Sequence, residues 1–333
     1  MTPEYAPLAE RRGVDVDTFR SDIMAAGNPV ILRDLVGDWG LVRAGQDGPN
    51  ALADSLKSAA IGGLVNVMRG APDIEGRFFY DGSMRGFNYQ SGQMEFGAFI
   101  DKVLNIETGE SLYMGSNPLP NIMPDMIIKC PMPLVPNGVP PRIWIGTNSV
   151  VSTHYDTDFN VACVVSGTRT FTLFPPTQIA NLYPGPIEHN MAGPQVSLPN
   201  PEKPDLKKFP KFETAMKQGR QAVLEPGDAI YIPPLWWHHV RAKGQLNVLM
   251  NYWWSPVPQY SRQPLEALVL SLLAVRQLPE AERAAWKNLF DYFIFQTEGD
   301  PMEHLPDDIS GVLGPHSPQR AQQIWEFFKG MMR

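Results

Sequence analysis

The sequence has little cysteine, little charge and no long apolar run. Cys130 and Cys163 are the only cysteines among 333 residues, too few for a disulfide scaffold, and this favours a reducing cytoplasmic location. Charged residues make up only 19% of the chain, against roughly 25% in an average soluble domain. The longest apolar stretch, 267–275 with Ser271 inside it, falls far short of the roughly 20 residues that cross a bilayer. The first residues also lack a signal-peptide core. We therefore expect a cytoplasmic protein without a membrane partner.

Positive charge is also in short supply. The chain has 28 Lys and Arg against 35 Asp and Glu, which gives a net charge of -7. A protein that grips a phosphate backbone needs clustered cations. The balance argues against a general nucleic-acid binder and leaves room only for a local basic groove.

Apolar residues and proline are plentiful. Hydrophobic residues make up 43% of the chain, enough for a substantial core, which excludes a mainly disordered protein. Proline accounts for 33 residues, close to twice the roughly 5% background. Together with 28 glycines, it predicts many turns and short strands.

Helix and strand mix in the first 118 residues, and a Pro-rich irregular stretch follows at 119–141. We expect a helix that Asp17 caps and Gly27 ends. Further helices are expected at 51–61 and 94–104, and strands at 29–32, 64–68, 77–80 and 111–115.

From residue 142 the pattern becomes short strands separated by turn residues, which is typical of an all-β barrel or sandwich. Eight strands are expected, at 142–147, 150–156, 160–165, 169–174, 221–224, 229–232, 237–242 and 247–253. Ser166–Thr168 and Glu225–Asp228 have the composition of hairpin turns. Residues 175–220 form an insertion with one short helix at 178–182 and a Pro/Lys-rich loop.

Helical periodicity returns after Pro258, with helices expected at 265–276, 281–295 and 317–332. The first is apolar on nearly every face, so something must cover it. We expect the cover to be a second copy of the chain, because two-fold pairing is the commonest solution; helices of the same chain are the alternative. The predicted organisation is a barrel domain at 1–258, with its core at 142–254 and an N-terminal elaboration at 1–141, and a helical dimerisation region at 259–333.

Two histidine motifs carry the chemistry. His154-Tyr155-Asp156 ends one expected strand, and residues two apart on a strand share a face. Trp236-Trp237-His238-His239 opens another strand after a Gly-Asp turn. If the strands are neighbours, two histidines and a carboxylate converge as in the facial triad of non-haem Fe(II) oxygenases. Three protein ligands leave coordination sites on the metal open for a co-substrate and O₂, whereas a structural zinc ion has all four of its coordination sites filled by protein ligands.

Each motif also has an ordinary explanation. A His-x-Asp triplet arises by chance, and a His pair beside two Trp can simply pack in a core. The order of triplet, turn and strands along the chain favours the metal interpretation.

The stretch from Arg142 to Trp254 resembles the JmjC, or cupin-like, branch of the 2-oxoglutarate oxygenases. Within it, the sequence is similar to the group of the asparaginyl hydroxylase that inhibits hypoxia-inducible factor and its bacterial relatives. The motifs are RIWIG (142–146), STHYD (152–156), Asn160, GTRTFTLFPP (167–176), PGDAIYIPPLWWHHV (226–240), NVLMNYWW (247–254) and, before the barrel, PVILRDLVGDW (29–39). The resemblance implies a double-stranded β-helix (jelly roll, cupin), Fe(II), 2-oxoglutarate as co-substrate and O₂.

The resemblance implies His154, Asp156 and His238 as metal ligands. The residue directly after the Trp pair matches the family position, and strand alternation sends His239 outward. Arg169 falls where this branch commonly has a Lys that pairs with the distal carboxylate of 2-oxoglutarate; a guanidinium can do the same with two hydrogen bonds.

Other co-substrate contacts are implied with less support from the residues alone. Tyr113 resembles a Tyr that reaches the same carboxylate, and Asn160 and Asn251 match polar positions near the co-substrate. The family usually has a Thr where this chain has Val151, so Thr153 or Thr147 is expected to supply that hydroxyl. The alternatives are a surface cation for Arg169 and a core side chain for Tyr113.

The resemblance implies hydroxylation of a C–H bond, with release of succinate and CO₂, on a protein side chain, an RNA base or a small molecule. Two functions of other classes stay open. One is a catalytically silent cupin that binds a ligand or partner, which the loss of a metal ligand would favour. The other is a different cupin metalloenzyme, such as an isomerase, which commonly has more histidines on its first strand.

Overall fold

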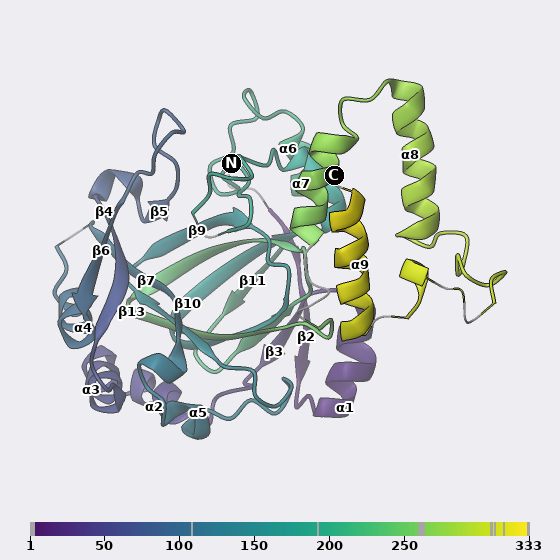
Figure 1. Ribbon diagram of the computed structural model, residues 1–333. Helices are drawn as coiled ribbons and strands as arrows, with labels where there is room; N and C mark the ends of the chain where they lie inside the picture. Colours follow the sequence, from purple (N-terminus) through teal and green to yellow (C-terminus); the bar gives the residue numbers. More distant parts are fainter. Residues whose placement is uncertain are drawn as a thin grey trace. The chain divides into compact units, whose positions relative to one another are not determined.

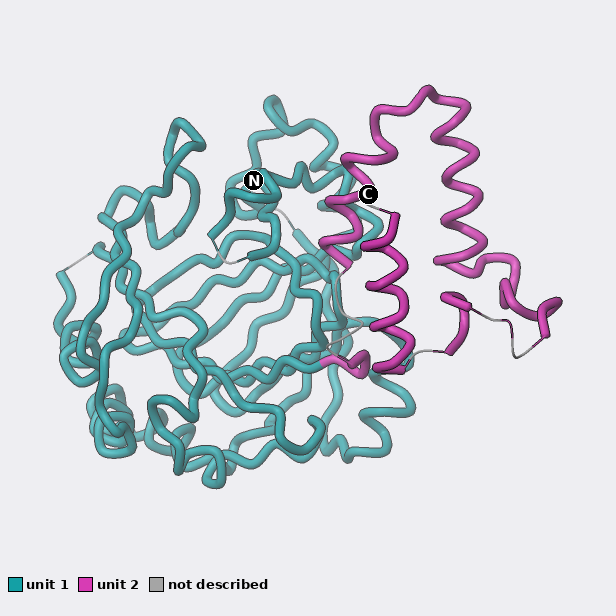
Figure 2. Tube along the Cα trace, in the orientation of Figure 1, with its two compact units in different colours: residues 1–254 teal, residues 255–333 magenta. Residues whose placement is uncertain are grey.

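The computed structural model describes residues 4–107, 109–191, 193–258, 264–306, 309, 311–315 and 317–331. The chain separates into two compact units, residues 1–254 and residues 255–333 (Figure 2). The predicted boundary after residue 258 adjoins 259–263, which lie outside the described residues.

Two long antiparallel strands form the centre of the first unit (Figure 1). β10 (Phe159–Phe174) and β13 (Trp237–Trp254) each join two of the expected strands into one. Their register shifts between Val164, Ser166 and Thr168. Ser166–Thr168 is therefore a bulged part of β10, and the predicted hairpin turn there is wrong. Gly167 has φ of +76°, and a Cβ at this position would collide with Asn247 Oδ1, so the bulge requires glycine.

Each long strand pairs with different partners along its two halves. The first half of β10 pairs with β12 (Ala229–Ile232) and its second half with β11 (Arg220–Leu224). β13 pairs first with β9 (Ser149–His154) and then with β8 (Arg142–Gly146). This is the predicted double-stranded β-helix, and the fold prediction is confirmed.

The turn at Glu225–Asp228 exists but does not make a hairpin. Asp228 N donates to Glu225 O at 3.0 Å. However, the strands on its two sides, β11 and β12, both pair with β10. The turn carries the chain from the second half of β10 to its first half.

Further strands extend the sheets. β3 (Val30–Arg33) and β2 (Ala9–Arg12) continue beyond β12. On the other side, β7 (Ser111–Pro118), β4 (Leu64–Gly70) and β6 (Gln90–Glu95) continue beyond β8. Two short strands add in parallel, β1 (Ala6–Pro7) to β11 and β5 (Arg77–Phe78) to β9.

Helices of the first unit share one large core with the sheet. The helices are α1 (Val16–Thr18), which continues as a π-helix at Phe19–Met24, α2 (Gly40–Gln46), α3 (Pro49–Ala59), α4 (Phe96–Leu104) and α5 (Met126–Lys129). Phe99 and Ile100 of α4 pack in the same cluster as Cys163, which is buried as expected of a small core residue. Asp15, not Asp17, caps the first helix, because its side chain accepts from Thr18 N at 2.8 Å.

The insertion between β10 and β11 contains a helix that the Lys-rich sequence concealed. A 3₁₀-helix spans Pro176–Asn181, and α6 spans Phe212–Gln218. Phe212 and Ala215 of α6 pack against Phe174 and Trp237. The apolar residues Phe212, Ala215 and Met216, at helical spacing between Lys211 and Lys217, are the sequence signal for α6.

The second unit is helical. It contains α7 (Pro264–Ala274), α8 (Glu280–Phe293), a 3₁₀-turn at Gly311–Leu313 and α9 (Pro318–Met331). Large apolar side chains are exposed on all three α-helices, among them Leu268, Val269, Leu270, Leu273, Trp286, Phe293, Trp325 and Phe327. Over the described ranges, no helix is both long and apolar enough to cross a membrane.

Candidate metal centre

The two histidine motifs meet across β9 and β13. His154 ends β9 and lies directly opposite His238 near the start of β13. Their rings are 4.3 Å apart between centroids. Asp156 follows β9 by two residues, and its Oδ2 lies 3.6 Å from His238 Nε2. One ligand atom from each residue falls within 4.8 Å of the others, so the cluster can hold one metal ion.

The backbone orients both imidazole rings. His154 Nδ1 lies 2.9 Å from Ser152 O, and His238 Nδ1 lies 3.0 Å from Trp236 O. A carbonyl only accepts, so Nδ1 must carry the proton and each Nε2 is left as a lone-pair donor. Burial, together with the nearby His154, lowers the pKa of His238, which favours its neutral form. Neutral imidazoles fixed through the second nitrogen are the usual histidine ligands of metals.

A cavity of about 130 Å³ adjoins the cluster inside the barrel. All three cluster residues line it, together with four of the five predicted co-substrate residues: Tyr113, Asn160, Arg169 and Asn251. The fifth, Thr153, does not line this cavity. Its Oγ1 lies 3.4 Å from His239 Nδ1 instead.

Arg169 is a buried cation that has no carboxylate partner among the described residues. Its side chain faces the cavity and the residue is 2% exposed, so it is not the surface cation of the alternative interpretation. Nε has no hydrogen-bond partner, and no carboxylate of the described chain forms an ion pair with Arg169. Burial lowers the pKa of Arg169 to about 10, so it stays charged at neutral pH. An uncompensated buried cation is costly, and the site therefore suits an anionic ligand.

Tyr113 complements this cation. Burial raises the pKa of Tyr113 to about 12, which keeps its phenol neutral and able to donate a hydrogen bond. Tyr113 comes from β7, while Arg169 comes from β10. Both line the same cavity, so a carboxylate there would meet a cation and a neutral donor.

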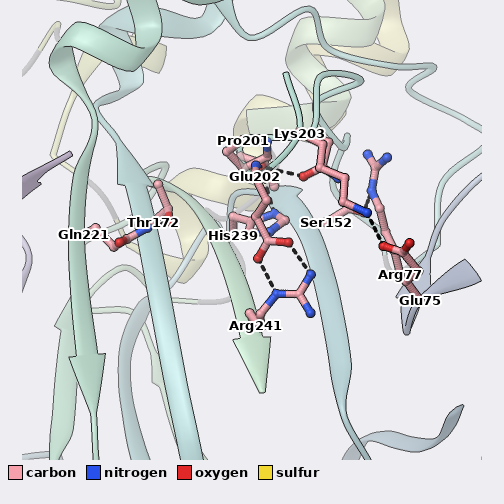
Figure 3. A network of polar contacts seen from close by, with 12 residues as sticks. Glu75, Arg77, Ser152, Thr172, Pro201, Glu202, Lys203, Gln221, His239 and Arg241 are labelled. Atoms are coloured by element: carbon pink, nitrogen blue, oxygen red, sulfur yellow. Dashed lines mark hydrogen bonds and ion pairs between the residues drawn. The ribbon is translucent and has the colours of Figure 1, made fainter. Parts of the chain in front are cut away.

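His239 lies on the opposite face of β13 but is not outside the protein. It is only 1% exposed, because the insertion covers this face. His239 does point away from the cavity, but the expectation that it would face solvent is wrong. Glu202 of the insertion lies between His239 and Arg241 (Figure 3). Burial raises the pKa of Glu202, but hydrogen bonds from Arg241 and His239 outweigh burial and bring it to about 2.

Two further contacts hold the part of the insertion that covers the cavity. Arg77 donates to Leu198 O at 3.4 Å, and Ser197 N donates to Thr153 O at 2.7 Å. The insertion adds apolar wall residues to the cavity that sequence reasoning did not find, namely Met191, Pro194 and Val196. No motif marks them, because their position depends on how the loop folds back onto β9.

Two tryptophans of the wall come from the barrel itself. Trp144 and Trp253 line the cavity, and their rings meet edge to face with centroids 5.7 Å apart. Tyr155 and Trp237 pack on each other in a separate cluster with centroids 4.8 Å apart.

Several known proteins are similar in sequence to parts of this chain. A family model for the cupin-like domain matches residues 16–260. Lysine-specific demethylase JMJ31 of Arabidopsis thaliana is 41% identical over 104 residues, 31% of this chain and 18% of that protein. Jumonji C domain-containing protein 5 of Drosophila melanogaster is 34% identical over 122 residues, covering 36% and 28%. HSPB1-associated protein 1 of Bos taurus is 30% identical over 158 residues, covering 46% and 32%. Each match spans no more than about a third of the relative's length.

Proposed function

This chain belongs to the cupin-like, JmjC-related family of 2-oxoglutarate oxygenases, and we propose that it is an Fe(II)- and 2-oxoglutarate-dependent hydroxylase of a substrate C–H bond. One observation carries the proposal. One cavity is lined both by a two-His, one-carboxylate cluster and by a buried cation that has no carboxylate partner within the described ranges. The cluster suits Fe(II), and the cation suits a carboxylate of 2-oxoglutarate.

The protein's part in this chemistry is binding and exclusion of water. His154, Asp156 and His238 would hold the metal, and Arg169 and Tyr113 would bind the distal carboxylate of 2-oxoglutarate. Bound Fe(II) would supply the activation of O₂, with one oxygen atom entering succinate, as CO₂ is lost from 2-oxoglutarate, and the other entering the substrate hydroxyl. The apolar walls keep water from the reacting atoms.

The substrate class is proposed to be a protein side chain, an RNA base or a small molecule. Relatives from Arabidopsis thaliana and Xenopus tropicalis are named lysine-specific demethylases. Oxidative demethylation begins with hydroxylation of an N-methyl C–H bond, after which formaldehyde leaves. The same proposed reaction therefore covers both hydroxylation and demethylation, and methylated lysine peptides belong among the compounds to test.

We expect the Fe(II)-loaded protein to convert 2-oxoglutarate to succinate, faster in the presence of its substrate. The measurement is succinate release in a screen of peptides, methyl-lysine peptides, amino acids and tRNA, with mass spectrometry for a gain of one oxygen or loss of a methyl group. Asp156→Ala is the control that should release none. A folded, Fe(II)-loaded protein that forms no succinate with or without any compound would argue for a silent cupin.

We also propose that the chain forms a homodimer through its C-terminal helices. The support is the number of large apolar side chains exposed on α7, α8 and α9, since a monomer rarely leaves such patches in water. A second copy presents the same surface, and two-fold pairing buries it on both chains at once.

The double variant Leu268→Glu, Leu272→Glu should convert the dimer to a monomer or to aggregates, because it places two charges on the apolar surface of α7. Light scattering at micromolar concentration measures the mass. The variant Gln277→Glu, Gln323→Glu changes two exposed glutamines by the same total charge and should stay dimeric. A monomeric mass for the unmodified protein would end the dimer proposal.

A further inference from the structure

The carboxylate of Asp156 receives two hydrogen bonds from side chains of the barrel strands. Trp253 Nε1 donates to Asp156 Oδ2 at 3.1 Å, and Asn160 Nδ2 donates to the same oxygen at 3.3 Å. Trp253 and Asn160 lie directly opposite each other on β13 and β10. Two neighbouring barrel strands therefore deliver two N–H groups to one oxygen of the predicted metal ligand.

A second pair of residues stands behind these donors. Asn251 Nδ2 donates to Asn160 Oδ1 at 3.1 Å, and Trp144 Nε1 donates to Asn251 Oδ1 at 2.7 Å. Every hydrogen bond in the series Trp144, Asn251, Asn160, Asp156 runs in the same direction, and the series ends on the carboxylate. Both asparagines are buried, so these bonds also fix which way each amide faces.

The series uses the polar groups that the sequence assigned to the co-substrate. Asn160 Oδ1 accepts from Asn251, and Asn160 Nδ2 donates to Asp156. In Asn251, Oδ1 accepts from Trp144 and Nδ2 donates to Asn160. Each amide keeps a second N–H and a second acceptor lone pair, but the bonds already made orient both amides within the series that ends at Asp156.

We propose that Trp253 and Asn160, held in turn by Asn251 and Trp144, are positioning residues that fix the Asp156 carboxylate in its metal-binding orientation. The inference rests on the proposed function, because it concerns the same metal. A carboxylate that must find its rotamer on metal binding loses conformational entropy, whereas one held by two donors has already lost it. Hydrogen-bond partners of metal ligands typically change metal affinity by about 10- to 100-fold.

The test is Mn²⁺ binding to the full chain without 2-oxoglutarate, with free Mn²⁺ measured by electron paramagnetic resonance. Trp253→Phe removes one donor and keeps most of the ring, and we expect its Mn²⁺ dissociation constant to rise by about 10-fold or more. Trp39→Phe is the matched control. It also loses an indole hydrogen bond, from Trp39 Nε1 to Pro131 O at 3.1 Å, but away from the cluster, and it should bind Mn²⁺ within about two-fold of the unmodified protein.

A second pair of variants separates positioning from co-substrate binding. Asn251→Ala should weaken Mn²⁺ binding in the absence of 2-oxoglutarate. Asn247→Ala, which removes another buried amide of β13 that bonds only to Gly244 O, should not. Circular dichroism confirms that each variant is folded, and Trp253→Phe keeps the test decisive if Asn251→Ala does not fold.

The outcomes distinguish the two proposals. If the unmodified protein binds Mn²⁺ and both Trp253→Phe and Asn251→Ala bind it equally well, the positioning role is overturned and the metal centre stands. If Asn251→Ala and Trp253→Phe bind Mn²⁺ normally and weaken only the binding of 2-oxoglutarate, the positioning role is overturned and these residues are co-substrate contacts. If the folded, unmodified protein binds no Mn²⁺, the proposed function falls together with the inference.

Discussion

Replacing His238 by alanine is expected to abolish metal binding, whereas replacing its neighbour His239 is expected to leave metal binding nearly intact. His238 is one of the three residues of the cluster, and its Nε2 lies 3.6 Å from Asp156 Oδ2. Even hydrogen-bond partners of ligands change affinity by about 10- to 100-fold, so the loss of a ligand should exceed about 100-fold. His239 points to the other side of β13, toward Glu202.

The measurement is Mn²⁺ or Fe(II) titration of His238→Ala and His239→Ala, with thermal unfolding as the check on each fold. His239→Ala should lower the unfolding temperature, because it removes a buried side chain beside Glu202 and Thr153. Loss of metal binding in His239→Ala alone would reverse the assignment of the ligand. Equal binding by all three proteins would remove both histidines from the site.

The metal cluster was predictable because both of its parts follow from local rules. The expected strand at 150–156 put His154 and Asp156 on one face; β9 ends at His154, and Asp156 still lies beside it just past the strand end. β13 begins at Trp237, and alternation along it puts His238 and His239 on opposite faces. Strand alternation does not predict whether the face of β13 that carries His239 is exposed to solvent. His239 is buried because residues near Glu202 return to β13 from an insertion, and no local pattern encodes that contact.

The fold shows the same division between local and long-range information. Each predicted barrel strand exists, but Ser166–Thr168 lies within one continuous strand. A short run with a central glycine fits a hairpin turn and a bulge equally well, because both need a positive φ. The pairing partner decides between them, and here the partner is β13 more than 70 residues away along the sequence.

The expected co-substrate residues also differ in how well the sequence placed them. Arg169 and Tyr113 were assigned from resemblance, and the cavity brings them together from β10 and β7. Thr153 was assigned as a hydroxyl donor, but its neighbour Ser152 is the residue of that pair that lines the cavity. Their order along β9 would have predicted this, since His154 and Ser152 share a face and Thr153 has the other.

The Arg169→Ala variant should lose most of its affinity for 2-oxoglutarate, while its affinity for the metal stays nearly unchanged. Truncating one partner of a buried charge pair costs about 2–5 kcal/mol, which corresponds to a rise in the 2-oxoglutarate dissociation constant of roughly 30-fold or more. Arg169→Lys should recover part of this affinity, since it restores the charge but not the two-pronged hydrogen bonding.

Ligand-dependent stability gives the sharpest measurement of this effect. Without 2-oxoglutarate, Arg169 is a buried charge that no carboxylate of the described residues neutralises, so its removal relieves an electrostatic cost and leaves a cavity in its place. With Mn²⁺ and saturating 2-oxoglutarate, the unfolding temperature of the unmodified protein should rise, because ligand binds only the folded state. Arg169→Ala should show a much smaller rise at the same concentrations, and Mn²⁺ alone should stabilise both proteins equally. An equal response of the two proteins to 2-oxoglutarate would mean that the buried guanidinium does not bind the co-substrate, and a different anion would then have to account for its burial.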